Sequence, residues 1–381
     1  MYSIKGYGAM IADSIRTGAY CNALRRAVKP GAVVVDIGTG TGIFALLACR
    51  FGARKVYAIE PSGAIAVARE IAAANGCQDR IEFIEELSTK VDLPEHADVI
   101  VSDLRGVLPL FEQHLPSIID ARRRLLAPGG NLIPKRDILW SAVVETPQNY
   151  DPLIQPWVRE RFQLNMDAAS QIVTNVWKKA RVTPDQLLTK PYCWATLDYL
   201  NLESPNVSSE MTFQVMRPGT AHGFVMWFDT FLDDGIEFSN APGQPKLIYG
   251  SGFFPWSSPV DLVPDDTVSV GLRANLVGSD YIWSWETRVC GNDSGQAKAH
   301  FRQSTFFGSA FSSVRLRKRA TSYLANLNDD GQIDKFILAM MDGNTSLGEI
   351  ATEVCSRFPR DFPAWQEALT HVGDLSVRYS R

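Results

Sequence analysis

Three glycines alternate with threonines after a β-branched stretch, in the sequence Val33-Val-Val-Asp-Ile-Gly-Thr-Gly-Thr-Gly42. A helical run, residues 43–50, follows at once, so the glycines lie on a turn between a strand and a helix. Glycine there permits a positive φ and lets a ligand approach the main chain without a Cβ in the way. A dinucleotide site needs the spacing G-x-G-x-x-G, and here Gly42 comes one residue early. The spacing therefore argues against NAD.

Two acidic residues accompany this turn. Asp36 precedes Gly38 by two residues, where a carboxylate would repel a phosphate but suits the ammonium of a methionine moiety. Glu60 ends the next predicted strand, where a carboxylate can accept hydrogen bonds from both hydroxyls of a ribose. Together they predict S-adenosylmethionine (SAM) as the cofactor. The residues expected to bind it here are Asp36, Gly38, Thr39, Gly40, Gly42, Glu60 and Pro61.

The composition excludes several classes of protein. A net charge of −4 over 381 residues argues against a nucleic-acid partner, which usually requires a basic surface. No apolar run approaches the roughly 20 residues of a membrane span, and the first residues lack a signal-peptide core. The six scattered cysteines are typical of reduced thiols in a cytoplasmic protein. The five histidines have no ligand spacing, so we expect no metal site.

The elements that must position these residues change character twice along the chain. Strands and helices alternate over residues 1–134, which predicts an α/β fold: a doubly wound, Rossmann-like parallel sheet with its ligand at the C-terminal strand ends. Residues 135–320 are rich in aromatic and β-branched runs, typical of an antiparallel β-barrel or sandwich, interrupted by a mostly helical arm over residues 151–190. Residues 321–381 predict a small helical module.

This order of domains resembles the protein arginine methyltransferases. The sequence Met10-Ile-Ala-Asp-Ser-Ile-Arg-Thr-Gly-Ala-Tyr20 is similar to the N-terminal helix of that family, and residues 81–94 resemble its adenine-binding segment. The resemblance implies that Arg16 pairs with the carboxylate of SAM and that Ser88 and Thr89 lie beside the base. It also implies a homodimer formed through the arm.

Residues 98–112 resemble the family's double-E hairpin, S-E-x-x-G…E. Asp103 replaces the first glutamate and is one methylene shorter, whereas Glu112 retains the second. Two carboxylates at this spacing match a planar guanidinium, and they could orient an acceptor or take its proton. We therefore expect Asp103 and Glu112 to be catalytic. Arg105 lies between them, and its charge would disfavour a cationic acceptor unless the side chain points away.

A second departure concerns the family's Thr-His-Trp loop, which aligns best with Leu247-Ile-Tyr249. Ile248 then stands in place of the histidine that pairs with the acid at Asp13. That pair is expected to be absent, unless His222 approaches from a neighbouring strand.

The last residues, 326–381, resemble more loosely the PqqD-like modules that bind leader peptides, although a plain three-helix cap fits the same pattern. We expect a SAM-dependent methyltransferase that modifies a nitrogen of a peptide or protein, arginine being one such acceptor. Two alternatives stay open. One is a small-molecule N- or O-methyltransferase, and the other is a non-catalytic scaffold that binds SAM or a peptide.

Overall fold

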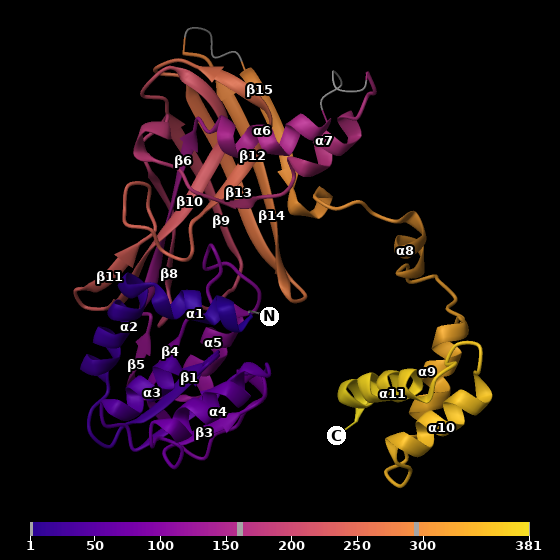
Figure 1. Ribbon diagram of the computed structural model, residues 1–381. Coiled ribbons are helices and arrows are strands. Elements are labelled where there is room, and N and C mark those ends of the chain that lie inside the picture. The colour runs from indigo at the N-terminus through magenta and orange to yellow at the C-terminus, as the bar shows by residue number, and fades with distance from the viewer. Residues whose placement is uncertain (1–2, 158–162, 293–296, 381) are drawn as a thin grey trace. The chain divides into compact units, whose positions relative to one another are not determined.

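The computed structural model describes residues 3–157, 163–292 and 297–380. The chain forms two compact units, residues 1–310 and 311–381 (Figure 1). Among the described residues, no helix is long and apolar enough to cross a membrane. The same residues contain no group of three or more histidine, cysteine, aspartate or glutamate side chains that could hold a metal ion.

The first unit begins with two helices and a parallel sheet, which confirms the predicted α/β fold. The sheet order is β3-β2-β1-β4-β5, so the chain moves outward from β1 in one direction and then returns to its other side. Such a reversal places a ligand at the C-terminal end of the central strands. The strands are β1 (Val33–Ile37), β2 (Lys55–Ile59), β3 (Ile81–Ile84), β4 (Ala97–Ser102) and β5 (Leu126–Ile133). The helices are α1 (Ile4–Ala12), α2 (Ser14–Ala27), α3 (Ile43–Arg50), α4 (Ala64–Ala74) and α5 (His114–Arg124), with the short η1 (Ser88–Lys90).

The rest of this unit consists of two antiparallel sheets, as the alternating aromatic and β-branched runs predict. Their strand orders are β7-β12-β10-β6-β8, with β11 beside β10, and β15-β14-β13-β9. Aromatic rings fill the space between the sheets: Phe254 lies 5.3 Å from both Trp283 and Trp285, measured between ring centroids. The strands are β6 (Arg136–Val144), β7 (Lys178–Ala180), β8 (Tyr192–Asp198), β9 (Val207–Gln214), β10 (Gly219–Asp233), β11 (Ile236–Ser239), β12 (Ser251–Leu262), β13 (Thr267–Val277), β14 (Asp280–Cys290) and β15 (Ala297–Ser304), followed by η5 (Thr305–Phe307).

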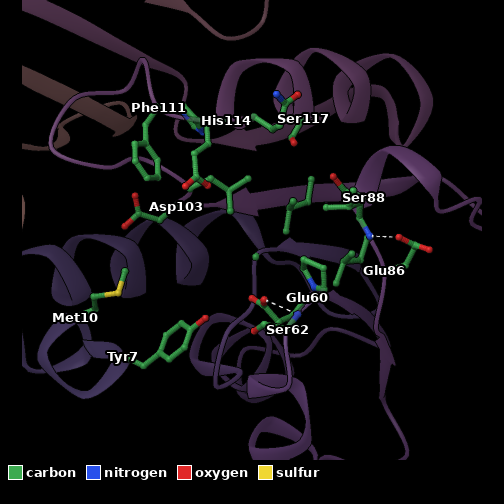
Figure 2. A pocket seen from close by; sticks show the side chains of 18 residues that line it. Tyr7, Met10, Glu60, Ser62, Glu86, Ser88, Asp103, Phe111, His114 and Ser117 are labelled. Atoms are coloured by element: carbon green, nitrogen blue, oxygen red, sulfur yellow. Dashed lines mark hydrogen bonds between the residues drawn. The ribbon is translucent and has the colours of Figure 1, made fainter. Parts of the chain in front are cut away.

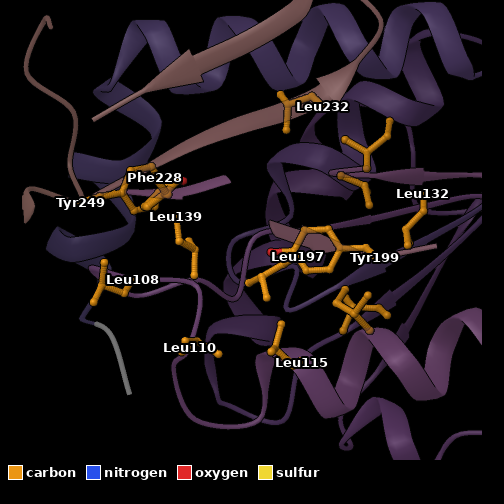
Figure 3. Packing of buried hydrophobic residues seen from close by; sticks show 14 of the residues in the cluster. Leu108, Leu110, Leu115, Leu132, Leu139, Leu197, Tyr199, Phe228, Leu232 and Tyr249 are labelled. Atoms are coloured by element: carbon orange, nitrogen blue, oxygen red, sulfur yellow. The ribbon is translucent and has the colours of Figure 1, made fainter. Parts of the chain in front are cut away.

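One hydrophobic core joins the parallel sheet to the antiparallel part (Figure 3). Leu108 and Leu115 belong to the same buried cluster as Leu139, Phe228 and Tyr249. Burying side chains of this size from both parts stabilises their mutual position. The residues of the two parts can therefore build one site.

The predicted arm is helical only in its first half. It contains α6 (Pro147–Ile154), η2 (Gln155–Trp157) and α7 (Asp167–Val173), and residues 158–162 lie outside the described residues. Beyond α7 the chain becomes extended and β7 pairs with β12, followed by the single turn η4 (Pro184–Gln186). Pairing with a sheet edge, which local sequence does not reveal, overrides the helical pattern there.

The second unit contains α8 (Ser313–Lys318), α9 (Asp329–Met340), α10 (Leu347–Arg357) and α11 (Trp365–Tyr379). The last three helices pack around their own small core, which includes Ile337, Ile350 and Val372. A reciprocal capping box begins α10: the Ser346 hydroxyl accepts from the Glu349 N–H at 3.3 Å, and the Glu349 carboxylate accepts from the Ser346 N–H at 2.9 Å.

Candidate active site

A cavity of about 560 Å³ opens at the C-terminal ends of the central parallel strands. Figure 2 shows Asp103 and Ser88 on opposite sides of this cavity, with Glu60 between them. The lining side chains come from α1, from the loops after β1, β2, β3 and β4, and from the start of α5. They are Tyr7, Met10, Ile37, Gly38, Ile59, Glu60, Pro61, Ser62, Glu86, Leu87, Ser88, Asp103, Leu104, Phe111, Glu112, Gln113, His114 and Ser117.

The glycine turn has the backbone conformation that its sequence predicts. Gly38, Gly40 and Gly42 have φ values of 73°, 54° and 87°. A Cβ on Gly38 would lie 2.3 Å from the Leu104 side chain, and one on Gly40 would lie 2.4 Å from the ring of Tyr7. The turn thus requires glycine both for its φ angles and for its close neighbours.

Glu60 is held with its carboxylate at the cavity wall. Its Oε2 accepts from the Gly40 N–H at 3.0 Å. Its Oε1 accepts from the Ser62 N–H at 3.1 Å (Figure 2). Each carboxylate oxygen has two acceptor sites, so both retain capacity for a further donor. This geometry fits a pair of ribose hydroxyls. Pro61 lines the wall beside Glu60, as predicted.

Asp36 lies beneath the turn and is fully buried. Its Oδ2 accepts from the Thr39 hydroxyl at 2.6 Å and from the Ala45 N–H at 3.0 Å, whereas Oδ1 has no hydrogen-bond partner among the described residues. Burial raises the pKa of Asp36 to about 7, although the two hydrogen bonds oppose the rise. A buried acceptor without a donor fits a nearby cation such as the ammonium of SAM. Among the described residues, the cavity lining includes Gly38 but not Asp36, Thr39, Gly40 or Gly42, which form and support the turn behind it.

The side of the cavity formed by the loop after β3 contains one of the two predicted adenine-binding residues. Ser88 is buried in the wall, whereas Thr89 is exposed and outside it. Sequence reasoning missed His114 and Ser117, which lie three residues apart on α5 and therefore share a helix face. Burial and the neighbouring charge of Arg105 lower the pKa of His114 to about 3, so its imidazole is neutral.

Asp103 occupies the other side of the cavity and is surrounded by donors. Its side chain is 2% exposed. Oδ2 accepts from Arg16 Nε at 2.6 Å and from the Tyr249 hydroxyl at 2.6 Å, and Arg16 Nη2 lies 2.5 Å from it as an ion-pair contact, whereas Oδ1 accepts from Arg105 Nε at 3.1 Å. Burial alone would raise the pKa of Asp103, but the charges of Arg16 and Arg105 and the Tyr249 hydroxyl lower it to about 2.

Arg16 lies directly behind Asp103. Besides that carboxylate, it donates from Nη1 to the Met10 carbonyl at 3.2 Å. Its side chain is 4% exposed and is absent from the cavity lining. The structure thus pairs Arg16 with Asp103, and the expected pairing with a SAM carboxylate stays a prediction.

Glu112, the second acid of the hairpin, lines the same cavity as Asp103 and is exposed. Its φ of 41° is unusual for a residue other than glycine. Strained backbone of this kind is found preferentially at functional sites, because the surrounding structure must hold it in place. The structure therefore brings both predicted catalytic acids to one cavity.

Arg105 points away from this cavity. Its fully buried guanidinium contacts Asp137 at 2.9 Å through Nη1, and it also bonds the hydroxyls of Thr230 and Tyr20. Because Asp103 and Asp137 balance its charge, Arg105 gives no reason to exclude a cationic acceptor. The sequence permits a cationic acceptor only if the Arg105 side chain points away, and its contacts with Asp137, Thr230 and Tyr20 meet this condition.

The family's histidine–acid pair is replaced by a main-chain contact. Asp13 caps α2 by accepting from the Arg16 N–H at 3.1 Å, and its other oxygen accepts from the Ile248 N–H at 2.7 Å. His222 does not take over this role, because its Nδ1 accepts from the Thr146 N–H at 3.1 Å and its ring packs on Tyr150.

Comparisons with known proteins show which family the chain resembles. Residues 16–133 match the family model described as ribosomal protein L11 methyltransferase (PrmA), and residues 135–321 match the arginine methyltransferase oligomerization subdomain. The chain is 31% identical to probable protein arginine N-methyltransferase 6.1 of Oryza sativa subsp. indica, over 70% of this chain and 68% of that protein. It is 30% identical to protein arginine N-methyltransferase 6 of Danio rerio, over 68% and 78% of the two chains. The chain belongs to the protein arginine methyltransferase family.

Coverage of the relatives is uneven within this family. The match with probable protein arginine N-methyltransferase 6 of Arabidopsis thaliana, at 31% identity, includes 62% of this chain and 55% of that protein, about half its length. Neither family model extends beyond residue 321, so α9, α10 and α11 lie outside both.

Solved structures share the fold of the first unit. Protein arginine methyltransferase 10 of Arabidopsis thaliana has a TM-score of 0.69 at 23% identity, over 79% of this chain and 97% of that one. The Trypanosoma brucei PRMT1 enzyme–prozyme complex with AdoHcy has a TM-score of 0.71 at 21% identity, over 78% and 96%.

Proposed function

We propose that the chain is a SAM-dependent methyltransferase that transfers a methyl group to an arginine nitrogen of a peptide or protein. The observation that supports this most is one cavity with a ribose-type carboxylate, Glu60, and the two acids of the family hairpin, Asp103 and Glu112. Membership of the arginine methyltransferase family agrees with it.

The residues of the glycine side fit SAM. Glu60 would accept hydrogen bonds from the ribose hydroxyls, Asp36 would face the ammonium group, and Ser88 would lie beside the adenine. When bound, SAM supplies an activated methyl on its sulfonium. The side chains of this protein must then align the acceptor nitrogen with that methyl.

The two acids would have different roles toward the acceptor: Asp103 would orient it, and Glu112 would remove its proton. Asp103, with a pKa of about 2, remains charged at neutral pH and is a weak base, so it orients a guanidinium through hydrogen bonds. Glu112 has no ion-pair partner among the described residues and is placed to take the proton that the acceptor releases.

Two further proposals concern assembly and location. A homodimer would form through the arm, whose described part exposes 61% of Leu164, and a monomer mass by light scattering at micromolar concentration would reject it.

A cytoplasmic location is supported by the six cysteines, all of which are free. Fractionation of cells that express the protein tests that location.

The acceptor class can be identified by incubating a cell extract with the protein and methyl-labelled SAM, followed by mass spectrometry. Label on arginine residues of proteins is the expected result. Label on small molecules would favour a small-molecule methyltransferase. Tight binding of SAM without transfer to any acceptor would favour the non-catalytic scaffold.

A further inference from the structure

We propose that Tyr249 is a positioning residue of the methyl-transfer reaction, which holds one oxygen of Asp103 and leaves the other for the acceptor. The inference rests on the proposed function and adds a residue that the family's hairpin motif does not contain. Tyr249 comes from the loop before β12, far in sequence from the acid it contacts.

The hydrogen bonds around Asp103 are unevenly shared between its two oxygens. Oδ2 accepts two hydrogen bonds, from the Tyr249 hydroxyl and from Arg16 Nε, whereas Oδ1 accepts one, from Arg105 Nε at 3.1 Å. A carboxylate oxygen offers about two acceptor sites, so Oδ2 is saturated and Oδ1 retains one. Of the two oxygens of Asp103, Oδ1 is therefore the one with capacity left to accept a hydrogen bond from an acceptor in the cavity.

The Tyr249 hydroxyl is well fixed for this task. It accepts from Arg16 Nε at 3.1 Å and donates to Asp103, so its single proton has a defined direction. The ring is 4% exposed, lies parallel to Phe238 at a centroid distance of 6.0 Å, and meets the edge of Phe228 at 5.2 Å.

The backbone beside Tyr249 is anchored as well. The Ile248 N–H donates to Asp13 at 2.7 Å, at the start of the helix that carries Arg16. One short segment of the antiparallel part thus contacts both the cap of α2 and the acid after β4.

Tyr249→Phe removes the hydroxyl and keeps the ring packing. We expect kcat to fall about tenfold, the size of one hydrogen bond, while KM for SAM stays within twofold. Tyr281→Phe is the matched control, since this buried tyrosine donates to the Pro205 carbonyl at 2.8 Å and lies outside the cavity lining. It should leave kcat within twofold of the parent.

A double-mutant cycle distinguishes positioning from general support of the fold. In an Asp103→Asn background, Tyr249→Phe should change kcat by less than twofold, because the hydroxyl acts through that carboxylate. A full tenfold loss in that background, or parent-like kcat in the single variant, would overturn the inference.

The parent, Tyr249→Phe, Asp103→Asn and the double variant also give a second cycle. In it, the equilibrium constant of unfolding in urea is measured, which requires no enzymatic activity. If the parent transfers no methyl group to any arginine-containing acceptor, the proposed function fails and this cycle decides the structural claim. A coupling of threefold or more between Tyr249 and Asp103 supports the contact, whereas independent effects reject it.

Discussion

The cofactor side and the acceptor side of the cavity are assembled in different ways. On the cofactor side, a glycine turn and a strand-end acid adopt their conformation through contacts within two short segments, such as the bond from the Gly40 N–H to Glu60. On the acceptor side, Asp103 depends on Arg16 from α2, Arg105 from its own loop and Tyr249 from the antiparallel part. The conformation of the cofactor side therefore depends on fewer segments of the chain than the conformation of the acceptor side.

This difference predicts that the two sides can be damaged separately. The largest effect should come from Asp103→Asn, which removes the charge that orients the acceptor and should cut turnover roughly 10²-fold or more. Affinity for S-adenosylhomocysteine (SAH), measured by calorimetry, should stay within a few-fold.

Asp103→Asn also leaves the buried guanidinium of Arg16 without its counter-charge, and breaking a buried pair typically costs about 3–5 kcal/mol. The free energy of unfolding must therefore be measured alongside turnover. A folded variant as active as the parent would remove Asp103 from the mechanism.

Glu60→Ala should produce the converse result, a loss of cofactor affinity. Each charge-assisted hydrogen bond to a ribose hydroxyl is worth about 1.5–3 kcal/mol, so SAH affinity should fall about 10- to 100-fold for each such bond that is lost. Glu82→Ala is the control, because that surface carboxylate pairs with Lys55 at 2.7 Å and does not line the cavity. Equal affinity in the parent and the Glu60 variant would reject the ribose assignment.

The two sides of the cavity also differ in how far the sequence alone predicts them. The glycine turn, Asp36 and Glu60 were predictable because their spacing alone defines a strand–turn–helix site. The contacts of Asp103 were not, since Tyr249 lies 146 residues away and only the folded sheets bring the two together. The sequence predicts helix for residues 178–180, which are extended, for a related reason: their conformation depends on pairing with β12.

A smaller effect is expected from pH. Burial raises the pKa of Asp36 to about 7, so this carboxyl is mostly protonated at pH 6 in the cofactor-free protein. A bound ammonium would favour its charged form, and binding would then release a proton. SAH affinity should therefore rise about tenfold from pH 6 to pH 8.

Calorimetry in buffers of different ionisation enthalpy measures that proton directly. His114, with a pKa of about 3, does not titrate in this range. The rise should disappear in Asp36→Asn. A rise that persists in this variant would assign the proton to another group.

The smallest effect on the cavity should follow deletion of residues 311–381, which form a separate unit. SAH affinity should stay within twofold, because the lining residues that the structure describes all belong to the first unit. If the helical module binds peptides, as its loose PqqD-like resemblance implies, the deletion should weaken methylation of a long substrate but not of a short one. If it is only a cap, the melting temperature should fall and both substrates should be affected equally.

The proposed function is tested most directly by identifying the residue that becomes methylated. The full-length protein, methyl-labelled SAM and an arginine-rich protein acceptor would be incubated, and the acid hydrolysate of the acceptor would be separated by chromatography. A cavity that pairs a SAM-type side with Asp103 and Glu112 predicts label in methylarginine and none when lysine replaces every arginine. Label confined to another residue, or no label despite SAH binding, would contradict the assignment.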